Sequence, residues 1–245
     1  MRNSKSITIF SFLLLMLFTA CEKENMLDVF KRTGPIVTVT REVTGFNKIF
    51  AEDNVNVFIT QDNFFEVKIE AGKNLISMIE TEVTDGTLFI RNKNTCNWAR
   101  SYDKPLNIYI TMPEILYITS NGTGNIVGLN TFTTDLFNVR TKNSGDIELT
   151  VNNTTVYSHM HGSGNVTMHG TTIEHACSIG GTGYLYCSDL QTRFTWLQTF
   201  TTGTCYVMAT DLLTCLIDLR GDVYCYGRPT KVEQKSKGEG LLYLR

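Results

Sequence analysis

This 245-residue sequence has no large excess of charge of either sign: 22 basic residues nearly balance 24 acidic ones, and the basic residues do not cluster. Because nucleic-acid binding requires a basic surface that neutralises phosphates, we expect no nucleic-acid partner. Proline is limited to four residues, and no long segment repeats apolar residues at the 3.6-residue spacing of a helix. Glycine, threonine, asparagine, tyrosine and β-branched residues are abundant instead. This composition predicts short strands joined by turns.

Long apolar runs are also scarce. The run from Ile7 to Ala20 is about 14 residues long, which is too short to span a bilayer but suits the core of a signal peptide. Arg2 and Lys5 precede it, as expected at the charged start of such a peptide. We therefore assign residues 1–20 to a signal peptide.

The apolar run ends in Leu-Phe-Thr-Ala-Cys, residues 17–21, which resembles the lipobox of bacterial lipoproteins. Phe18 stands where leucine is usual. The resemblance implies that Cys21 is lipidated and that the membrane is a partner through its acyl chains, each buried methylene contributing ~0.8 kcal/mol. The alternative is an ordinary secretory signal followed by an incidental cysteine.

We interpret residues 21–34 as a polar tether. It opens with Glu22, Lys23 and Glu24, and such a charged start resembles the surface-export signal of Bacteroidetes lipoproteins. We expect an outer-membrane lipoprotein, on either the cell surface or the periplasmic side.

Residues 35–112 alternate polar and apolar side chains as strands do, and we interpret them as β-rich N-terminal coils of a larger solenoid. A short helical turn is expected at residues 74–81, with Asn74 as its cap. The Asp85-Gly86 pair predicts a turn, and the polar residues 92–104 predict an exposed loop. The expected strands begin at Ile36, Asn54, Phe65, Thr87 and Leu106.

From residue 113 to residue 245 a glycine-containing phrase recurs, first as Ser-Asn-Gly-Thr-Gly-Asn-Ile-Val-Gly at residues 120–128. The units repeat at steps of 21, 19, 19, 22, 16 and 19 residues. A period near 20 residues in a glycine-punctuated β sequence is typical of a solenoid. The anchors that we align are Gly124, Gly145, Gly164, Gly183, Cys205, Gly221 and Gly240.

The position two residues after each anchor is apolar in every unit. In a parallel β-solenoid, coils stack ~4.8 Å apart and alternate side chains point inward, so this column and the other even offsets should fill the interior. The anchor glycines are expected at turns with positive φ. The inward column reads Ile126, Ile147, Val166, Leu185, Val207, Val223 and Leu242.

Two stretches, residues 46–92 and 118–128, resemble the auto-transporter adhesin head GIN-domain family of Bacteroidetes. The resemblance runs from about residue 37 to 244, and its motifs are Gly-Asn-Ile at 124–126, Gly-Asp-Ile at 145–147 and Gly-Asn-Val at 164–166. It implies a right-handed parallel β-helix in the cell envelope. Our expected fold is therefore an all-β, single-stranded β-solenoid with coils of about 20 residues.

The cysteines of the repeat region are interpreted as small buried thiols. Cys177 and Cys215 share a column two coils apart, ~9.6 Å, which is too far for a disulfide. Cys187 and Cys225 repeat the pattern with Ala209 between them. Uneven coil lengths leave some pairing open.

The histidines do not converge on one point in this alignment. His159 and His161 should face outward and His175 inward, so we expect no metal site and one core histidine. Arg-Gly-Asp at residues 220–222 coincides with the repeated glycine motif. We interpret it as part of the repeat and not as a cell-attachment signal.

A polysaccharide lyase or hydrolase is the alternative class, because β-helices include such enzymes. Their sites cluster carboxylates on one outer face. Asp146 and Glu148 should face outward, but the equivalent positions of the next coil carry Asn165 and Thr167, so the carboxylates do not form a cluster across coils. We therefore expect no catalytic residues and no cofactor.

An aromatic surface is predicted where the odd, outward offsets of the later coils carry tyrosine. Such a face suits a protein partner or self-association, or glycans stacked on its rings. In the alternative interpretation, the N-terminal segment or a C-terminal cap covers the face. The sequence thus predicts a non-catalytic, adhesin-like interaction module; the alternative is a polysaccharide-binding or polysaccharide-degrading protein. The expected face comprises Tyr184, Tyr186, Tyr206, Met208, Tyr224, Tyr226 and Tyr243.

Overall fold

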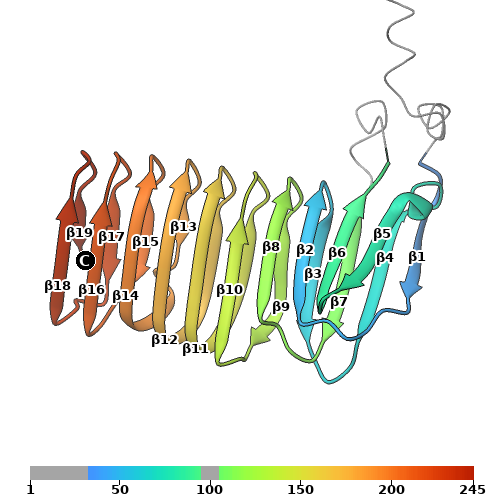
Figure 1. The fold of residues 1–245 in the computed structure, drawn as a ribbon, viewed down its shortest axis with the longest axis horizontal. Coiled ribbons are helices and arrows are strands. Elements are labelled where there is room, and N and C mark those ends of the chain that lie inside the picture. Colours follow the sequence, from blue (N-terminus) through green and yellow to red (C-terminus); the bar gives the residue numbers. More distant parts are fainter. Residues whose placement is uncertain (1–32, 95–104) are drawn as a thin grey trace, which may run out of the picture.

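The computed structural model describes residues 33–94 and 105–245 and shows an elongated β-solenoid (Figure 1). Cys21, the signal peptide and most of the tether lie outside the described residues, as does most of the loop expected at residues 92–104. Within residues 33–94 and 105–245, no helix has the length and hydropathy needed to span a bilayer.

Two parallel sheets build the regular part of the solenoid, and each coil adds one strand to each sheet. Sheet one contains β9 (Ile126–Phe132), the first half of β11 (Ile147–Gly162) and of β12 (Val166–Gly181), β13 (Leu185–Tyr186), β15 (Cys205–Met208), β17 (Val223–Tyr226) and β19 (Leu242–Leu244). Sheet two contains β8 (Tyr117–Gly122), β10 (Leu136–Thr141), the second halves of β11 and β12, β14 (Leu190–Thr201), β16 (Leu212–Ile217) and β18 (Lys231–Ser236).

The inward positions follow the predicted alternation, which confirms the solenoid. Strand β11 alternates buried and exposed side chains for most of its length, because consecutive residues of a strand point to opposite faces. Apolar residues from both sheets meet between them and form one continuous core. Leu185, for example, is fully buried beneath Val166, while Tyr184 beside it is exposed.

The fifth unit is shifted by two residues from the predicted alignment. Leu185 pairs with Cys205, and Cys205 pairs with Val223, so the anchor of this coil is Gly203. Our alignment on Cys205 was therefore wrong. The sequence pattern did not reveal the error, because a two-residue shift preserves the inward or outward parity and leaves the apolar pattern intact. The alignment had placed Val207 in the Leu185 column; it lies one step further along, beside Cys225.

The repeated glycines are required by close packing between coils. A Cβ at Gly164 would meet the carbonyl oxygen of Gly145, and a Cβ at Gly183 would meet that of Gly164. The positive φ that we expected is wrong for this column, since these glycines are absent from the positive-φ residues of the described chain. A side chain is excluded because the coils approach too closely at this corner.

The residue after the glycine links neighbouring coils through its side chain. Oδ1 of Asn125 accepts the backbone N–H of Asp146 (3.1 Å), and Oδ1 of Asp146 accepts that of Asn165 (2.7 Å). Asn165 does the same for Tyr184 (2.9 Å). The recurring Gly-Asn/Asp-Ile phrase therefore combines a close approach, an inter-coil hydrogen bond and a core residue.

The N-terminal end departs from the regular stack in coil order. The coil formed by β2 (Lys48–Asp53) and β3 (Asn56–Gln61) lies between two others: β8 and β9 on one side, and β6 (Thr87–Asn92) and β7 (Asn107–Met112) on the other (Figure 1). All four of these pairings are parallel. Neighbouring coils are therefore not consecutive in sequence here.

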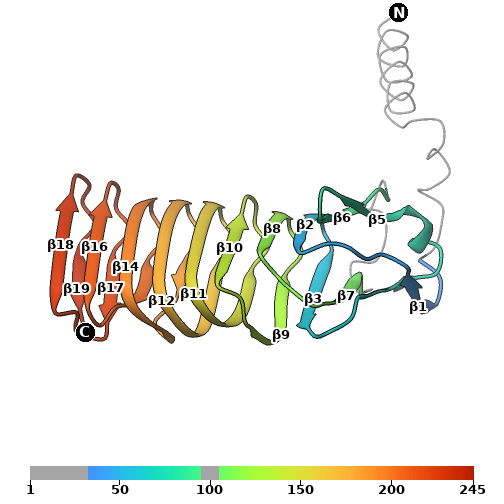
Figure 2. The same cartoon turned by 60° about the horizontal axis from the view of Figure 1, so that its bottom comes forward.

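Antiparallel strands finish this end. β4 (Glu66–Gly72) pairs with β7 and with β1 (Ile36–Arg41), and β5 (Ile79–Thr84) pairs with β6, all antiparallel. Residues 35–112 thus contain both solenoid coils and an antiparallel end layer (Figure 2). The expected helical turn is only a 3-10 turn, η3 (Ile76–Met78), whose N-cap is Leu75 and not Asn74.

Candidate functional site: the tyrosine ladder

Four tyrosines from successive coils occupy one outward column of sheet one. The register pairs Tyr186 with Tyr206, Tyr206 with Tyr224, and Tyr224 with Tyr243. Their ring centroids are 5.4, 5.4 and 4.7 Å apart, and the rings are stacked. Tyr184 extends the row, its ring 5.9 Å from that of Tyr186. We call these five residues the tyrosine ladder.

The ladder presents a partly exposed surface of neutral phenol rings. Tyr184 and Tyr186 are 40% and 41% exposed, and the other three are half-buried. Burial, together with the neighbouring tyrosines, raises the pKa of Tyr206, so its phenol stays neutral at physiological pH. The described coils leave these rings partly accessible, and the guanidinium of Arg245 lies over Tyr224 and Tyr243, 5.5 and 5.7 Å from their ring centroids.

The other two residues of the predicted face lie beside the ladder. Met208 and Tyr226 pair with each other in the next outward column, and both are half-buried. The structure therefore places all seven predicted residues on one side of the C-terminal coils.

A further aromatic pair belongs to the same column and was missed in the sequence. Phe58 and Tyr109 stack with centroids 5.1 Å apart, and Phe58 pairs with Val127 of the next coil. The column then continues through residues 148 and 167 to Tyr186. Phe58 could not be placed from the sequence because its coil neighbours β9, about 69 residues later in the chain.

The five described cysteines of the repeat region are free and buried, as predicted. Leu197 separates Cys177 from Cys215. Burial raises the pKa of Cys205 and of Cys215 to about 12, so these thiols are poor nucleophiles. Val207, and not Ala209, precedes Cys225 in its column.

The histidines lie as their parity predicted. His175 is buried and His159 faces outward, where it lines a shallow hollow of about 360 Å³ together with Tyr157 and Trp196. Burial and then Arg140 lower the pKa of His159. Among the described residues, no group of three histidine, cysteine or carboxylate side chains is placed to hold a metal ion.

Two outward aspartates of the repeat accept inter-coil hydrogen bonds. Asp222 of the Arg-Gly-Asp stretch accepts the backbone N–H of Leu241 at 2.9 Å, as Asp146 does for the next coil. Arg220 pairs with Glu239 on the surface, and Gly221 belongs to the glycine column. The Arg-Gly-Asp residues thus have structural roles within the repeat.

Several solved structures share this fold. One described as a "putative adhesin" from Bacteroides fragilis NCTC 9343 is 24% identical, with a TM-score of 0.82 over 86% of this chain and 97% of that chain. Another from Parabacteroides merdae ATCC 43184 is 17% identical, with a TM-score of 0.68 over 87% and 98% of the two chains. A "putative lipid binding protein" from Parabacteroides distasonis ATCC 8503 is 19% identical, with a TM-score of 0.68 over 86% and 97%.

No curated protein matches the chain. The family described as "Putative auto-transporter adhesin, head GIN domain" matches residues 45–229. These residues include the coils of β2 and β3, the glycine column as far as Gly221, and the ladder as far as Tyr224. The match spans well over half of the chain, and the chain therefore belongs to this adhesin head GIN-domain family.

Proposed function

We propose that this protein is a non-catalytic interaction module of the cell envelope, held at the outer membrane through a lipidated Cys21. It binds a protein surface, including that of a second copy, through the tyrosine ladder. Membership of an adhesin family supports the envelope setting. The register of the tyrosines is the observation that carries the binding role.

A stacked row of tyrosines suits protein recognition for two physical reasons. Each ring offers apolar area together with a hydroxyl that donates or accepts a hydrogen bond, which is why tyrosine is enriched at interfaces. The rings are also held by their neighbours at 4.7 to 5.9 Å. Such rings lose little conformational entropy when a partner binds.

Site-specific crosslinking and sedimentation together test this proposal. A photo-crosslinking amino acid at position 206 on intact cells should give discrete protein adducts, while the same group at position 157 on sheet two should give none. If the partner is a second copy, the sedimentation coefficient of the purified chain should rise with concentration.

Substitution by serine then ties either signal to the ladder. Replacing Tyr184, Tyr206 and Tyr224 by serine should abolish the signal, whereas the matched triple variant of Tyr157, Phe194 and Trp196 should retain it. Unfolding of the ladder variant would show that the rings are core residues, and equal behaviour of both triple variants would refute the binding role.

Glycan stacking on the same rings is the second candidate. Tyr184 and Tyr186 are the most exposed rungs and lie nearly parallel, 8° apart. A flat sugar ring can stack on such a platform. Glycan-array binding that is lost in the ladder triple variant would favour this candidate over a protein partner.

A further inference from the structure

The last coil of the described chain leaves the core of the solenoid open at its end. Its strands β18 and β19 each pair on one side only among the described residues, with β16 and β17 (Figure 1). Val232 is 36% exposed, whereas Leu213, its neighbour in the preceding coil, is fully buried. Leu244 is 53% exposed, whereas Cys225 before it is fully buried. Inward apolar positions are therefore uncovered here, and the end of a solenoid needs a cover.

Strand β18 also directs backbone groups toward its free edge. The backbone N–H of Lys231 donates to the carbonyl oxygen of Asp211 at 3.0 Å, so the backbone groups of Lys231 point toward the preceding coil. Successive residues of a strand direct their N–H and C=O groups to opposite edges. Val232, Gln234 and Ser236 therefore present theirs at the free edge, where another strand can pair with them.

The charges of β18 are complementary to those of a second β18. All its side chains are exposed, and Glu233 and Lys235 flank Gln234 on the outward side. Antiparallel pairing of two copies about Gln234 would set Glu233 of each copy opposite Lys235 of the other. Gln234 would form a hydrogen-bonded pair with itself, so these flanking pairs would be the close pairs of the ladder, with Cα atoms ~4.5 Å apart. Opposite charges directly across such a pair are stabilising.

The other registers are less favourable. Centring the pairing on Glu233 or on Lys235 would set that side chain against its own copy, and like charges directly opposite are destabilising. Centring on Val232 would pair only the first half of β18. In the register about Gln234, Lys231 faces Lys237 of the second copy, but both already have carboxylate partners, in Glu233 and Asp218 respectively.

We propose that the C-terminal coil binds a second copy of this chain end to end, as a two-fold symmetric dimer in which the two β18 strands pair antiparallel about Gln234. β19 lies in the facing sheet, so the same axis across the core sets it antiparallel to its own copy. The contact covers Val232 and Leu244, and it closes at a dimer because a two-fold interface is self-complementary. The contact lies at the end of the solenoid and the ladder lies on the outward face of sheet one, so neither depends on the other.

Charge reversal tests the dimer, with sedimentation velocity of the full-length chain in detergent micelles as the measurement. We expect the wild type to dimerise as its concentration rises. Glu233→Lys and Lys235→Glu should each weaken the dimer at least ~10-fold, because each creates two like-charged pairs across the axis. An equimolar mixture of the two variants should dimerise again, since every lysine then faces a glutamate. Both side chains are exposed, so the thermal unfolding midpoints should stay unchanged.

A matched control is Lys48→Glu, which reverses an exposed lysine of β2 in the middle of the stack and should dimerise as the wild type does. A monomeric wild type, a mixture that associates no better than its two components, or growth into assemblies larger than a dimer would overturn the proposal.

The ladder and the end contact are separated by their variants. The triple serine variant of Tyr184, Tyr206 and Tyr224 should still form the end-to-end dimer, and crosslinking from position 206 should persist in both charge variants. Sedimentation of the ladder variants is compared in the Glu233→Lys background, in which the end contact is removed. The two proposals therefore fail independently.

Discussion

His175 occupies an inward position of sheet two, between Val156 and Thr195 of the adjoining coils. Its Nε2 lies 2.8 Å from Ser158 Oγ and 3.2 Å from Cys177 Sγ. Burial lowers the pKa of His175 to about 4, because the charged imidazolium would lose its hydration without gaining an anionic partner. The folded protein therefore keeps this ring neutral at physiological pH.

Acid should destabilise the protein through His175. In the unfolded chain its pKa returns to ~6.5, so between pH 6.5 and 4 only the unfolded state binds the proton. The free energy of unfolding is therefore not lowered by this protonation above pH 6.5, and it falls by ~1.4 kcal/mol per pH unit from there down to about pH 4. Urea unfolding at pH 7.5 and 4.5 should show that His175→Leu loses about 3 kcal/mol less than the wild type on acidification.

The exposed His161 provides the control for this measurement. His161→Gln should follow the wild type at both pH values. His175→Leu should be less stable than the wild type at pH 7.5, because Ser158 loses its partner, so the quantity that decides is the difference between the two pH values. Equal acid sensitivity of the two variants would show that His175 is not the titrating group.

At the scale of the element, the glycine column sets how closely successive coils stack. Gly164→Ala would place a methyl group against the carbonyl oxygen of Gly145, which is backbone and cannot move independently of its coil. We expect a loss of ~1–3 kcal/mol in the free energy of unfolding, the usual cost of overpacking. The exposed neighbour Ser163→Ala should change it by less than ~0.5 kcal/mol. Equal losses in urea titrations would mean that the coils can separate locally at little cost.

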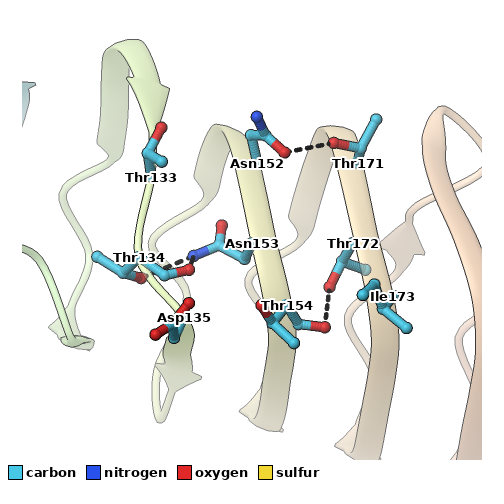
Figure 3. Close-up of a pocket in the computed structure, with 9 residues that line it drawn as sticks. All are labelled: Thr133, Thr134, Asp135, Asn152, Asn153, Thr154, Thr171, Thr172 and Ile173. Atoms are coloured by element: carbon cyan, nitrogen blue, oxygen red, sulfur yellow. Dashed lines mark hydrogen bonds between the residues drawn. The ribbon is translucent and has the colours of Figure 1, made fainter.

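The period-two pattern predicted most of the fold because each strand buries alternate residues. It also located the ladder, since Tyr206 keeps its outward parity under the two-residue shift of its unit. It could not detect the shift from Cys205 to Gly203, because both residues have the same parity. The sequence also did not reveal the polar groove of about 600 Å³ that residues 133–135, 152–154 and 171–173 line, because it forms at a corner between coils (Figure 3).

At the scale of the molecule, the coil order at the N-terminal end is the feature that local patterns do not reveal. β2 and β3 carry ordinary alternating sequences, yet they insert between β6–β7 and β8–β9. Antiparallel β1, β4 and β5 then complete the end of the stack. The solenoid therefore has an irregular end at the tether and a regular end at the ladder (Figure 1).

This polarity would give the proposed lipid anchor a geometric consequence. Residue 33, where the described chain begins, adjoins the antiparallel end, whereas Tyr224 and Tyr243 lie in the coils at the opposite end (Figure 2). A lipid on Cys21 would thus present the ladder away from the membrane.

We expect radiolabelled palmitate to label the wild-type chain in cells and not Cys21→Ser, because the thiol is the acyl acceptor. The variant should also move from the membrane to the soluble fraction, since multiple acyl chains provide stable anchoring. Label that persists in Cys21→Ser would show that another residue is acylated. The inferred orientation of the ladder, which depends on an anchor at Cys21, would then have no support.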